Sequence, residues 1–270
     1  MAKNYLISGA NSGIGRALAE DLAQRGHRVF ATAPTESECE SLEGISERVI
    51  PLLLDLRSAD HIERVKAAVL EHTSQLDGLI NNAGVGLFGP VELLEMASIR
   101  NSFEINVFGH IQMTQAFLPL LREAEGARIV FTGSVAGLMA QPIGGCYAST
   151  KSAIHAFCDS LRMELKPQNI HVSVLQPGRI QTPIWSTTQY DAYDDHPGIA
   201  PYQEALVSAQ KLMKVNERAA VPVERVTRAM RHALFSKRPK AKYLVGADAR
   251  FVGWLRLLPA SILDWILMRL

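Results

Sequence analysis

The chain has 270 residues, of which 47% are hydrophobic and 20% charged, a composition typical of a globular protein with a sizeable core. Its 28 basic and 27 acidic residues give a net charge of +1, so no basic excess exists to neutralise nucleic-acid phosphates. Three cysteines, Cys39, Cys146 and Cys158, are too few and too widely spaced to predict a metal site or a disulfide framework.

The N-terminal residues enter an apolar run, Tyr5-Leu6-Ile7, almost at once. This leaves no room for the charged region, apolar region and cleavage site of a signal peptide. Since the cysteines are then expected to be reduced thiols, we predict a cytoplasmic protein.

Short apolar runs alternate along the chain with longer segments of helical periodicity. The runs predict strands at residues 4–8, 28–33, 49–54, 78–81, 128–132, 170–176 and 241–245. The other segments predict helices at 14–25, 59–73, 97–123, 147–166 and 223–235. This order implies an α/β fold: a doubly wound, Rossmann-type parallel sheet of about seven strands with helices on both faces. Because no repeat or linker divides the chain, residues 1–270 are predicted to form a single domain.

Residues 182–220 interrupt this alternation. They contain three prolines, an acidic pair and several aromatic residues, namely Pro183, Pro197, Pro201, Asp194-Asp195, Trp185, Tyr190, Tyr193 and Tyr202. So long an excursion in a compact domain is usually a functional loop. Since it follows the sixth strand, at the carboxyl edge where open α/β sheets bind ligands, we predict a substrate lid at about 182–220.

A glycine-rich turn, Ser8-Gly9-Ala10-Asn11-Ser12-Gly13-Ile14-Gly15, joins the first strand to the first helix. Its spacing is GxxxGxG, in place of the GxGxxG fingerprint. Glycine permits close approach of the backbone, and the free N–H groups at a helix start attract a pyrophosphate. Within a strand–turn–helix unit, the turn predicts a dinucleotide site formed by Gly9, Asn11, Ser12, Gly13, Ile14 and Gly15.

The ends of the next two strands should select the dinucleotide. The second strand ends just before Pro34, with neither a carboxylate for the ribose hydroxyls nor a basic residue for a 2′-phosphate at its tip; Glu36 lies beyond the proline. A missing carboxylate removes its repulsion of a phosphate, which favours NADP over NAD. The third strand ends at Asp55 and Leu56, where Asp55 either accepts a hydrogen bond from the adenine amino group or serves as a turn residue.

Tyr147 and Lys151 lie four residues apart at the start of a predicted helix. This spacing puts both side chains on one helix face, one turn apart. A free phenol loses its proton near pH ~10, and an adjacent ammonium favours the phenolate, which lowers the pKa towards neutrality. The pair is therefore suited to exchange a proton with a carbonyl or carbinol oxygen.

Three more polar positions are associated with this pair. Ser134 follows the fifth strand, where its hydroxyl either aligns a substrate oxygen or caps a turn. Asn106 lies on an apolar helix face and needs hydrogen-bond partners, which indicates a buried polar network. The fourth strand ends in a polar turn where a ribose and a nicotinamide can lie, Asn81-Asn82-Ala83-Gly84.

Together these motifs resemble the short-chain dehydrogenase/reductase family, in its compact single-domain branch. The resemblance spans about residues 4–245, with the motifs in the family's order: the glycine turn, Asp55, NNAG, the helix asparagine, the serine, YxxxK, and Pro177-Gly178 followed by Thr182. It implies an NAD(P)-dependent oxidoreductase that interconverts an alcohol and a ketone or aldehyde.

The resemblance also implies a role for each site residue. Tyr147 would transfer the proton, Ser134 would position the substrate oxygen, and Lys151 would lower the pKa of the tyrosine and bind the nicotinamide ribose. Asn106 would hold Lys151 through a water and link it to solvent. Further cofactor contacts would come from Asn82, Ala83 and Gly84 along the cofactor's centre, and from Pro177, Gly178, Ile180 and Thr182 at its nicotinamide.

The side chains expected around the substrate are mostly apolar: Val85, Leu87, Phe88, Leu138, Met139, Pro142, Ile143, Ile184 and Trp185. Such walls suit a lipophilic alcohol or ketone. The overall pattern is similar to the hydroxysteroid and retinol dehydrogenase group, which implies a steroid-like or retinoid-like substrate. The predicted helices at 97–123 and 147–166 resemble those through which family members pair, which implies a homodimer or homotetramer.

An amphipathic tail occupies about residues 248–270, where Trp, Leu and Ile are interrupted by Arg250, Arg256, Pro259, Asp264 and Arg269. It lacks the ~20 unbroken apolar residues of a membrane span. We expect a helix that packs on the core, on a partner subunit or at the mouth of the substrate site. Peripheral membrane contact through the tail is the alternative.

Two other functions remain open. A 3-oxoacyl-carrier-protein reductase would use the same chemistry, although its acidic carrier calls for a basic patch that the sequence does not display. A non-catalytic NAD(P)-sensing protein would keep the fold, but such proteins generally lose the tyrosine or the lysine, and both are present here.

Overall fold

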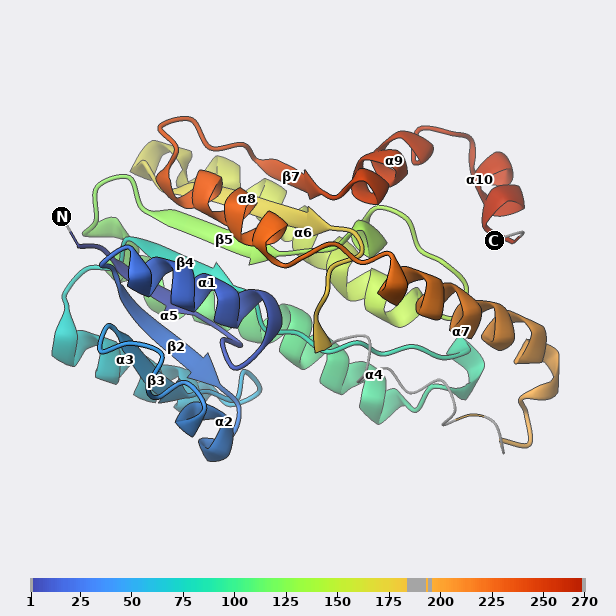
Figure 1. Cartoon of the computed structure of the whole chain (residues 1–270), viewed down its shortest axis with the longest axis horizontal. Coiled ribbons are helices and arrows are strands. Elements are labelled where there is room, and N and C mark those ends of the chain that lie inside the picture. Colours follow the sequence, from blue (N-terminus) through green and yellow to red (C-terminus); the bar gives the residue numbers. More distant parts are fainter. Residues whose placement is uncertain (1, 184–192, 194–195, 269–270) are drawn as a thin grey trace.

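The computed structural model of the chain describes residues 2–183, 193 and 196–268. Within them, seven parallel strands form one sheet in the order β3-β2-β1-β4-β5-β6-β7 (Figure 1). The strands are β1 (Asn4–Ile7), β2 (Arg28–Ala33), β3 (Val49–Leu53), β4 (Gly78–Asn81), β5 (Arg128–Thr132), β6 (His171–Pro177) and β7 (Lys242–Val245). The predicted α/β fold, a single Rossmann-type domain, is confirmed, and each predicted strand is present to within a residue at either end.

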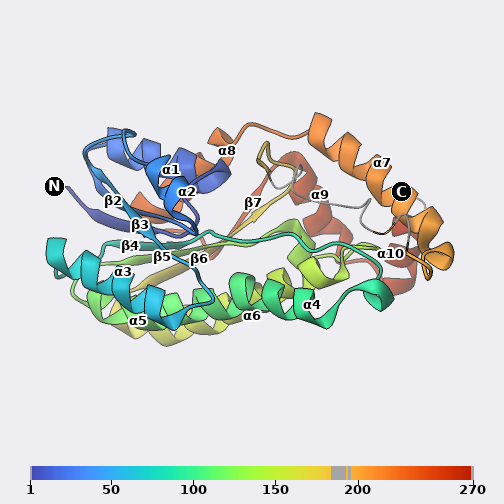
Figure 2. The ribbon, with the colours of Figure 1, turned by 90° about the horizontal axis from the view of Figure 1, so that it is seen from below.

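Helices cover both faces of the sheet, as Figure 2 shows. One face packs on α3 (Ala59–His72), α5 (Gly109–Arg122) and α6 (Gly145–Leu165), and the other on α1 (Gly13–Gln24) and α8 (Glu224–Phe235). In β1, Leu6 points to the first layer, while Tyr5 and Ile7 point to the second. Because successive strand side chains alternate between faces and both faces are covered, the strands are apolar throughout.

The predicted helix at 97–123 is divided in the structure. It consists of α4 (Met96–Phe103), a π-helical turn η2 (Glu104–Phe108) and α5. At the junction, a Cβ on Gly109 would lie 2.6 Å from the Cβ of Leu56, so the helix passes very close to the end of β3. A π turn inserts one extra residue and often occurs at functional sites. Here it contains Asn106.

Beyond the carboxyl ends of the strands lie α7 (Gln203–Arg218), α9 (Ala247–Leu255) and α10 (Ala260–Leu267) (Figures 1 and 2). The segment predicted as a substrate lid therefore contains a helix of 16 residues, α7, preceded by the short helix η7 (Ala200–Tyr202). The remaining short helices are α2 (Glu36–Glu40), η1 (Val91–Leu93), η3 (Val135–Gly137) and η4 (Lys166–Gln168).

Candidate active site

A cavity of about 1570 Å³ opens at the carboxyl edge of the sheet. It extends from the ends of β1, β2 and β3 to α7 and α9. Most of the sequence-predicted site residues line it, namely Gly9, Asn11, Ser12, Gly13, Ile14, Asp55, Leu56, Asn82, Ala83, Gly84, Ser134, Tyr147, Lys151, Pro177, Gly178, Ile180 and Thr182. Gly15 and Asn106 are not among its lining residues. The structure thus brings together residues that are up to 173 positions apart, since Gly9 and Thr182 share one cavity.

The glycine turn requires glycine because the backbone approaches its neighbours closely. Gly9 has a φ of +65°, and a Cβ on it would lie 2.8 Å from the Cα of Ala83. A Cβ on Gly15 would overlap the carbonyl oxygen of Gly9. The turn leads into α1, whose N-cap residue Ser12 makes no side-chain capping bond, which leaves the first N–H groups available to an anion. The site therefore fits a pyrophosphate.

Asn82 ties the end of β4 to the glycine turn. Its Nδ2 donates to the carbonyl oxygens of Ser8 (3.1 Å) and Gly9 (2.9 Å), and its Oδ1 accepts from the hydroxyl of Thr132 (3.0 Å). With these partners the amide fixes the floor of the cavity. The adjacent Ala83 and Gly84 present backbone to the cavity's centre.

Ser134 and Tyr147 meet from different elements, the end of β5 and the first turn of α6. Ser134 caps η3, with its Oγ accepting from the N–H of Ala136 (3.1 Å). Burial raises the pKa of Tyr147 to about 12, and a hydrogen bond with Ser134 opposes this rise. The ring of Phe88, which also lines the cavity, lies 5.3 Å from the tyrosine ring. The phenol is therefore protonated at neutral pH.

Lys151 lies one helical turn after Tyr147 and is 4% exposed. Its Nζ donates to the carbonyl oxygen of Thr132 (3.0 Å) and is 5.6 Å from the centre of the tyrosine ring. Burial lowers the pKa of Lys151 to about 8. From the sequence, the ammonium was predicted to lower the pKa of the phenol. In the structure desolvation has the larger effect and the pKa of Tyr147 rises, because the fold removes much of the water around this partly exposed side chain.

Asn106 is fully buried in the π turn and has three hydrogen-bond partners. Its Oδ1 accepts from the N–H of Val85 (2.8 Å), and its Nδ2 donates to the carbonyl of Val85 (2.8 Å) and to the hydroxyl of Thr150 (3.1 Å). A Cβ on Gly84 would lie 3.1 Å from Asn106 Oδ1 and 3.4 Å from Lys151 Nζ. The buried polar network inferred for Asn106 thus links α6 to the loop after β4.

At the opposite end of the cavity, Asp55 has a cationic partner that sequence reasoning missed. Arg57 NH2 lies 2.7 Å from Asp55 Oδ2. This hydrogen bond, the largest effect on the carboxyl, lowers the pKa of Asp55, so the carboxylate is charged. The side chain lines the cavity where an adenine would lie, and both of its oxygens already accept hydrogen bonds from Arg57.

Glu38 is a second residue that sequence reasoning missed here. It projects from α2 into the cavity, where its Oε1 accepts from Asn11 Nδ2 (2.8 Å) and its Oε2 accepts from the Thr35 hydroxyl (2.8 Å). The signal was present in the sequence: Thr35-x-x-Glu38 has the spacing of a capping box, which begins a helix and turns its third residue back towards the strand end. The helix that follows β2 therefore brings a carboxylate to this end of the cavity.

The loop after β6 closes the cavity against the glycine turn. A Cβ on Gly13 would lie 3.3 Å from Thr182 Cγ2, so Thr182 packs on the turn. Ile180 forms an isolated parallel bridge with Val221 and is buried. This contact brings the chain on both sides of α7 to the mouth of the cavity.

The apolar walls agree with the expected set only in part. Val85, Phe88, Met139 and Pro142 line the cavity, whereas Leu87, Leu138 and Ile143 are not among its lining residues; Ile143 is buried with Leu206 in a small separate cluster. Ile184 and Trp185 lie outside the described residues, as do Tyr190 and the acidic pair at 194–195. Apolar lining that was not predicted comes from α7: Ala205, Ala209, Leu212 and Met213. The tail also contributes apolar lining, in agreement with one of its expected positions, through Phe251, Val252, Leu255, Leu267 and Met268.

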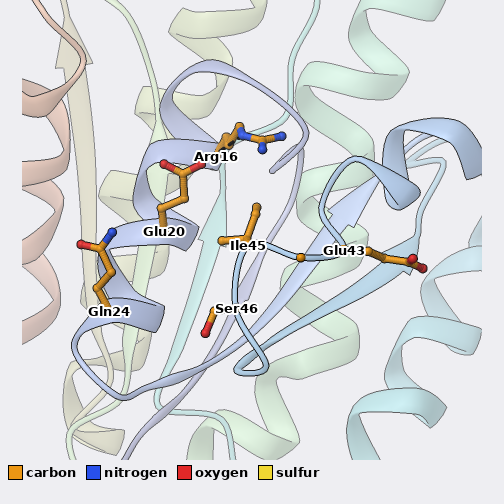
Figure 3. A pocket seen from close by; sticks show the side chains of 7 residues that line it. Arg16, Glu20, Gln24, Glu43, Ile45 and Ser46 are labelled. Carbon is orange, nitrogen blue, oxygen red and sulfur yellow. Dashed lines mark hydrogen bonds and ion pairs between the residues drawn. The ribbon is translucent and has the colours of Figure 1, made fainter.

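A smaller hollow of about 410 Å³ lies between α1 and the segment before β3 (Figure 3). Arg16, Glu20 and Gln24 line it from α1, opposite Glu43, Ile45 and Ser46. Arg16 is paired with Glu20 (3.0 Å) and donates to the carbonyl of Ser41 (3.1 Å). This hollow contains none of the site residues identified above.

Within the described ranges, no helix combines the length and the apolar character that crossing a membrane requires.

Comparison with known proteins agrees with this geometry. The model of the short chain dehydrogenase family matches residues 3–192. The chain is 35% identical to the uncharacterized oxidoreductase YbbO of Escherichia coli (strain K12), over 99% of this chain and 94% of that protein. It is also 35% identical to human retinol dehydrogenase 5, over 97% of this chain and 86% of that protein. A solved short-chain dehydrogenase from Streptomyces avermitilis superimposes with a TM-score of 0.83 at 28% identity, covering 98% of this chain and 96% of that one. The chain therefore belongs to the short-chain dehydrogenase/reductase family of NAD(P)-dependent oxidoreductases.

Proposed function

We propose that this protein reduces, and in reverse forms, a lipophilic ketone or aldehyde. The observation that carries the proposal is the continuation of the cavity beyond Ser134 and Tyr147, where α7 and α9 supply apolar walls. A site with such walls and few polar groups favours a hydrophobic neutral substrate over a small hydroxy acid.

The cofactor-binding end of the cavity fits a dinucleotide on the chain's own geometry. The glycine turn and the start of α1 would hold the pyrophosphate, and the loops after β4 and β6 would hold the nicotinamide half. When bound, the nicotinamide supplies or accepts a hydride. The protein's part is to hold the substrate oxygen and to move a proton.

That proton comes from Tyr147. With its pKa raised to about 12, the phenol is protonated at neutral pH and donates to the carbonyl oxygen as that oxygen gains negative charge. The Ser134 hydroxyl, which shares a hydrogen bond with Tyr147, would orient the same oxygen. The Lys151 ammonium near the tyrosine ring stabilises the phenolate that remains. Asn106 would hold Lys151 through a water and connect it to solvent.

The cofactor preference depends on Glu38. The sequence favoured NADP because no carboxylate stood at the tip of β2. Glu38 lies at this end of the cavity and is held in place by Asn11 and Thr35. A carboxylate there accepts hydrogen bonds from ribose hydroxyls and repels a 2′-phosphate. We therefore propose NAD as the preferred cofactor.

The names of relatives support the substrate class. Human retinol dehydrogenase 5 (35% identical) and human 17-beta-hydroxysteroid dehydrogenase type 6 (34% identical, 99% of this chain) are named for a retinoid and a steroid. Both match nearly the whole chain, including the part that forms α7 and α9. We propose a retinoid, a steroid or a comparable lipophilic molecule as the substrate.

A purified-enzyme assay that crosses NADH and NADPH with ketosteroids, retinal, 3-oxoacyl thioesters and short polar carbonyl compounds tests this proposal. We expect turnover of the lipophilic compounds, measured as the decrease in the absorbance of the reduced nicotinamide. Turnover confined to short polar compounds or to acyl-carrier substrates would overturn the substrate assignment. No turnover of any carbonyl compound would overturn the catalytic one.

We also propose that the tail contacts a lipid surface at the mouth of the cavity. Trp254 and Trp265 are 73% and 58% exposed on α9 and α10, next to exposed Arg250 and Arg256. Apolar and aromatic side chains beside arginines are typical of helices that lie in a membrane interface. Because Phe251 of α9 also lines the cavity, a lipophilic substrate could enter from that surface.

Co-sedimentation with anionic phospholipid vesicles tests the tail proposal. The double variant Trp254→Ser/Trp265→Ser should bind vesicles less than the wild type. The matched control Leu70→Ser, which removes a half-exposed apolar side chain from α3, should not change binding. Unchanged binding by the double variant would exclude the tail as the contact.

Finally, we propose a homodimer or homotetramer that pairs through the layer of α5 and α6. Phe108 and Met163 are exposed large hydrophobic side chains on this layer, 47% and 63%. Light scattering of the wild type should give a mass that is a multiple of the 29.7 kDa chain mass. The variant Met163→Glu should give a lower mass than the wild type. A monomeric wild type would contradict the assembly.

A further inference from the structure

One carboxylate joins helix α9 to the loop that follows β6. Asp248 lies in the first turn of α9, and its Oδ2 accepts a hydrogen bond from the backbone N–H of Arg179 (2.7 Å). The same oxygen lies 3.4 Å from the guanidinium Nε of Arg179, and the carboxylate side chain is only 17% exposed. A charge-assisted bond to a backbone N–H is among the stronger hydrogen bonds in proteins. The contact spans 69 positions of the sequence.

Gly178 allows this contact because it has no side chain. A Cβ on Gly178 would overlap the carboxylate of Asp248, so the carboxylate packs directly on the glycine Cα. The N–H of Gly178 donates to the carbonyl of Val245 (3.0 Å), and the carbonyl of Arg179 accepts from the N–H of Val221 (2.9 Å). The loop is therefore held by β7, by the segment before α8 and, through Asp248, by α9.

This loop is the part of the chain that we assign to the nicotinamide half of the cofactor. Pro177, Gly178, Ile180 and Thr182 line the cavity there, together with Asp248 itself. Asp248 lies beyond residues 3–192, the part that the family model matches. Its role is therefore not contained in the motifs from which the family was identified.

We propose that Asp248 is a positioning residue for the nicotinamide-binding loop, through which the C-terminal helix α9 sets the geometry of the cofactor site. This inference rests on the proposed function, since it assumes that the loop holds the nicotinamide. Without the carboxylate, the Arg179 N–H loses its acceptor and the loop loses one of its three supports. Displacements of about 1 Å in such a loop are enough to reduce catalysis severely.

The same helix connects the loop to the substrate wall. Phe251, Val252 and Leu255 of α9 line the cavity, while Asp248 at the start of α9 holds Arg179. A displacement of α9 therefore moves the apolar wall and the nicotinamide-binding loop together. Contacts made by the tail can in this way affect cofactor binding.

Isothermal titration with NADH and with ADP-ribose, which lacks the nicotinamide, tests the proposal without relying on turnover. In Asp248→Ala the Kd for NADH should rise about tenfold or more, as the loss of a hydrogen bond to a charged group predicts, while the Kd for ADP-ribose should stay within about twofold. Asp248→Asn keeps an oxygen that can accept from the Arg179 N–H, so it should recover most of the NADH affinity. Asp264→Asn, an exposed aspartate on α10, is the matched control and should leave both constants unchanged.

A second pair of variants guards against simple misfolding. Gly178→Ala alone should weaken NADH binding because its Cβ meets Asp248, but the Asp248→Ala background removes the three atoms that this Cβ would meet first. The two substitutions should therefore be clearly less harmful together than the sum of their separate effects predicts. Equal weakening of NADH and ADP-ribose by Asp248→Ala, or additive effects of the pair, would overturn the positioning role. A wild type that binds neither NADH nor ADP-ribose would instead overturn the proposed function.

Discussion

Replacing Glu38 with glutamine should change the cofactor preference of the enzyme. The carboxylate lies at the adenosine end of the cavity, where Asn11 and Thr35 hold both of its oxygens at 2.8 Å. Glutamine has the same shape and can keep the bond from Asn11, but it removes the negative charge. The variant therefore tests the charge of residue 38 with little change in packing.

The expected magnitude follows from Coulomb's law. Two unit charges about 4 Å apart interact by ~1 kcal/mol in water and by ~4 kcal/mol at an effective dielectric of ~20. A phosphate carries about −1.5 to −2 charges at neutral pH, and Glu38 is partly buried, so the repulsion of a 2′-phosphate lies between these limits. Its removal should raise kcat/KM for NADPH relative to NADH by roughly 10–100-fold, since each ~1.4 kcal/mol is a factor of ten.

The assay is a comparison of kcat/KM for NADH and NADPH with one carbonyl substrate, at low and high salt. Part of the wild-type preference for NADH should be lost at high salt, because ions screen a partly exposed charge. Glu36→Gln is the matched control: Glu36 lies on the same helix but is exposed and does not line the cavity. A preference that is unchanged in Glu38→Gln, or shifted equally in Glu36→Gln, would refute the reasoning.

Three more predictions concern protons. Tyr147→Phe should lose at least ~100-fold in turnover, the usual contribution of acid–base catalysis, and should keep its affinity for NADH; near-normal turnover would exclude the tyrosine as the proton donor. Because burial lowers the pKa of Lys151 to about 8, its ammonium is lost as pH rises through that value, so kcat/KM for carbonyl reduction should fall above pH 8. Lys151→Arg should move this fall in kcat/KM to higher pH. An unchanged pH profile would contradict the assignment of the fall to deprotonation of Lys151. Burial lowers the pKa of His110 from 6.5 to about 3, so the imidazole is neutral in the folded protein. As pH falls, the unfolded chain therefore takes up this proton at a higher pH than the folded protein does. Its contribution to stability is therefore complete above pH 6.5 and decreases as pH falls towards 3, with a slope of about 1.4 kcal/mol per pH unit. Denaturant unfolding of His110→Gln should show a weaker acid dependence than the wild type, and an equal dependence would contradict this account.

Local patterns in the sequence were sufficient for most of the fold. The apolar runs at 28–33, 78–81 and 128–132 coincide with β2, β4 and β5 because strands covered on both faces need apolar side chains throughout. Helix boundaries were also close, since Gly145–Leu165 and Glu224–Phe235 carry the helical period along their whole length. The helix α7 within residues 182–220 was not predicted, because the prolines that precede it are typical of loops.

The site was predictable where a motif is contiguous or regularly spaced. The glycine turn and the pair Tyr147 and Lys151 were identified because strand–turn–helix order and a spacing of four are visible in one dimension. Glu38 has the sequence signal of a capping box, but it lies beyond the proline that follows β2 and was not predicted as a site residue. Asp248 carried no local signal: its partner Arg179 is 69 positions away.

The sequence by itself determined the order of strands and helices along the chain and pointed to the glycine turn and to the pair Tyr147 and Lys151 as site candidates, because these depend on periodicity and on residue chemistry. The tertiary structure alone decided the direction of the pKa shift of Tyr147 and the link between α9 and the loop after β6. Burial and contact are properties of the whole fold: the desolvation of a phenol, or the approach of a carboxylate to a glycine, depends on atoms contributed by elements far apart in the chain.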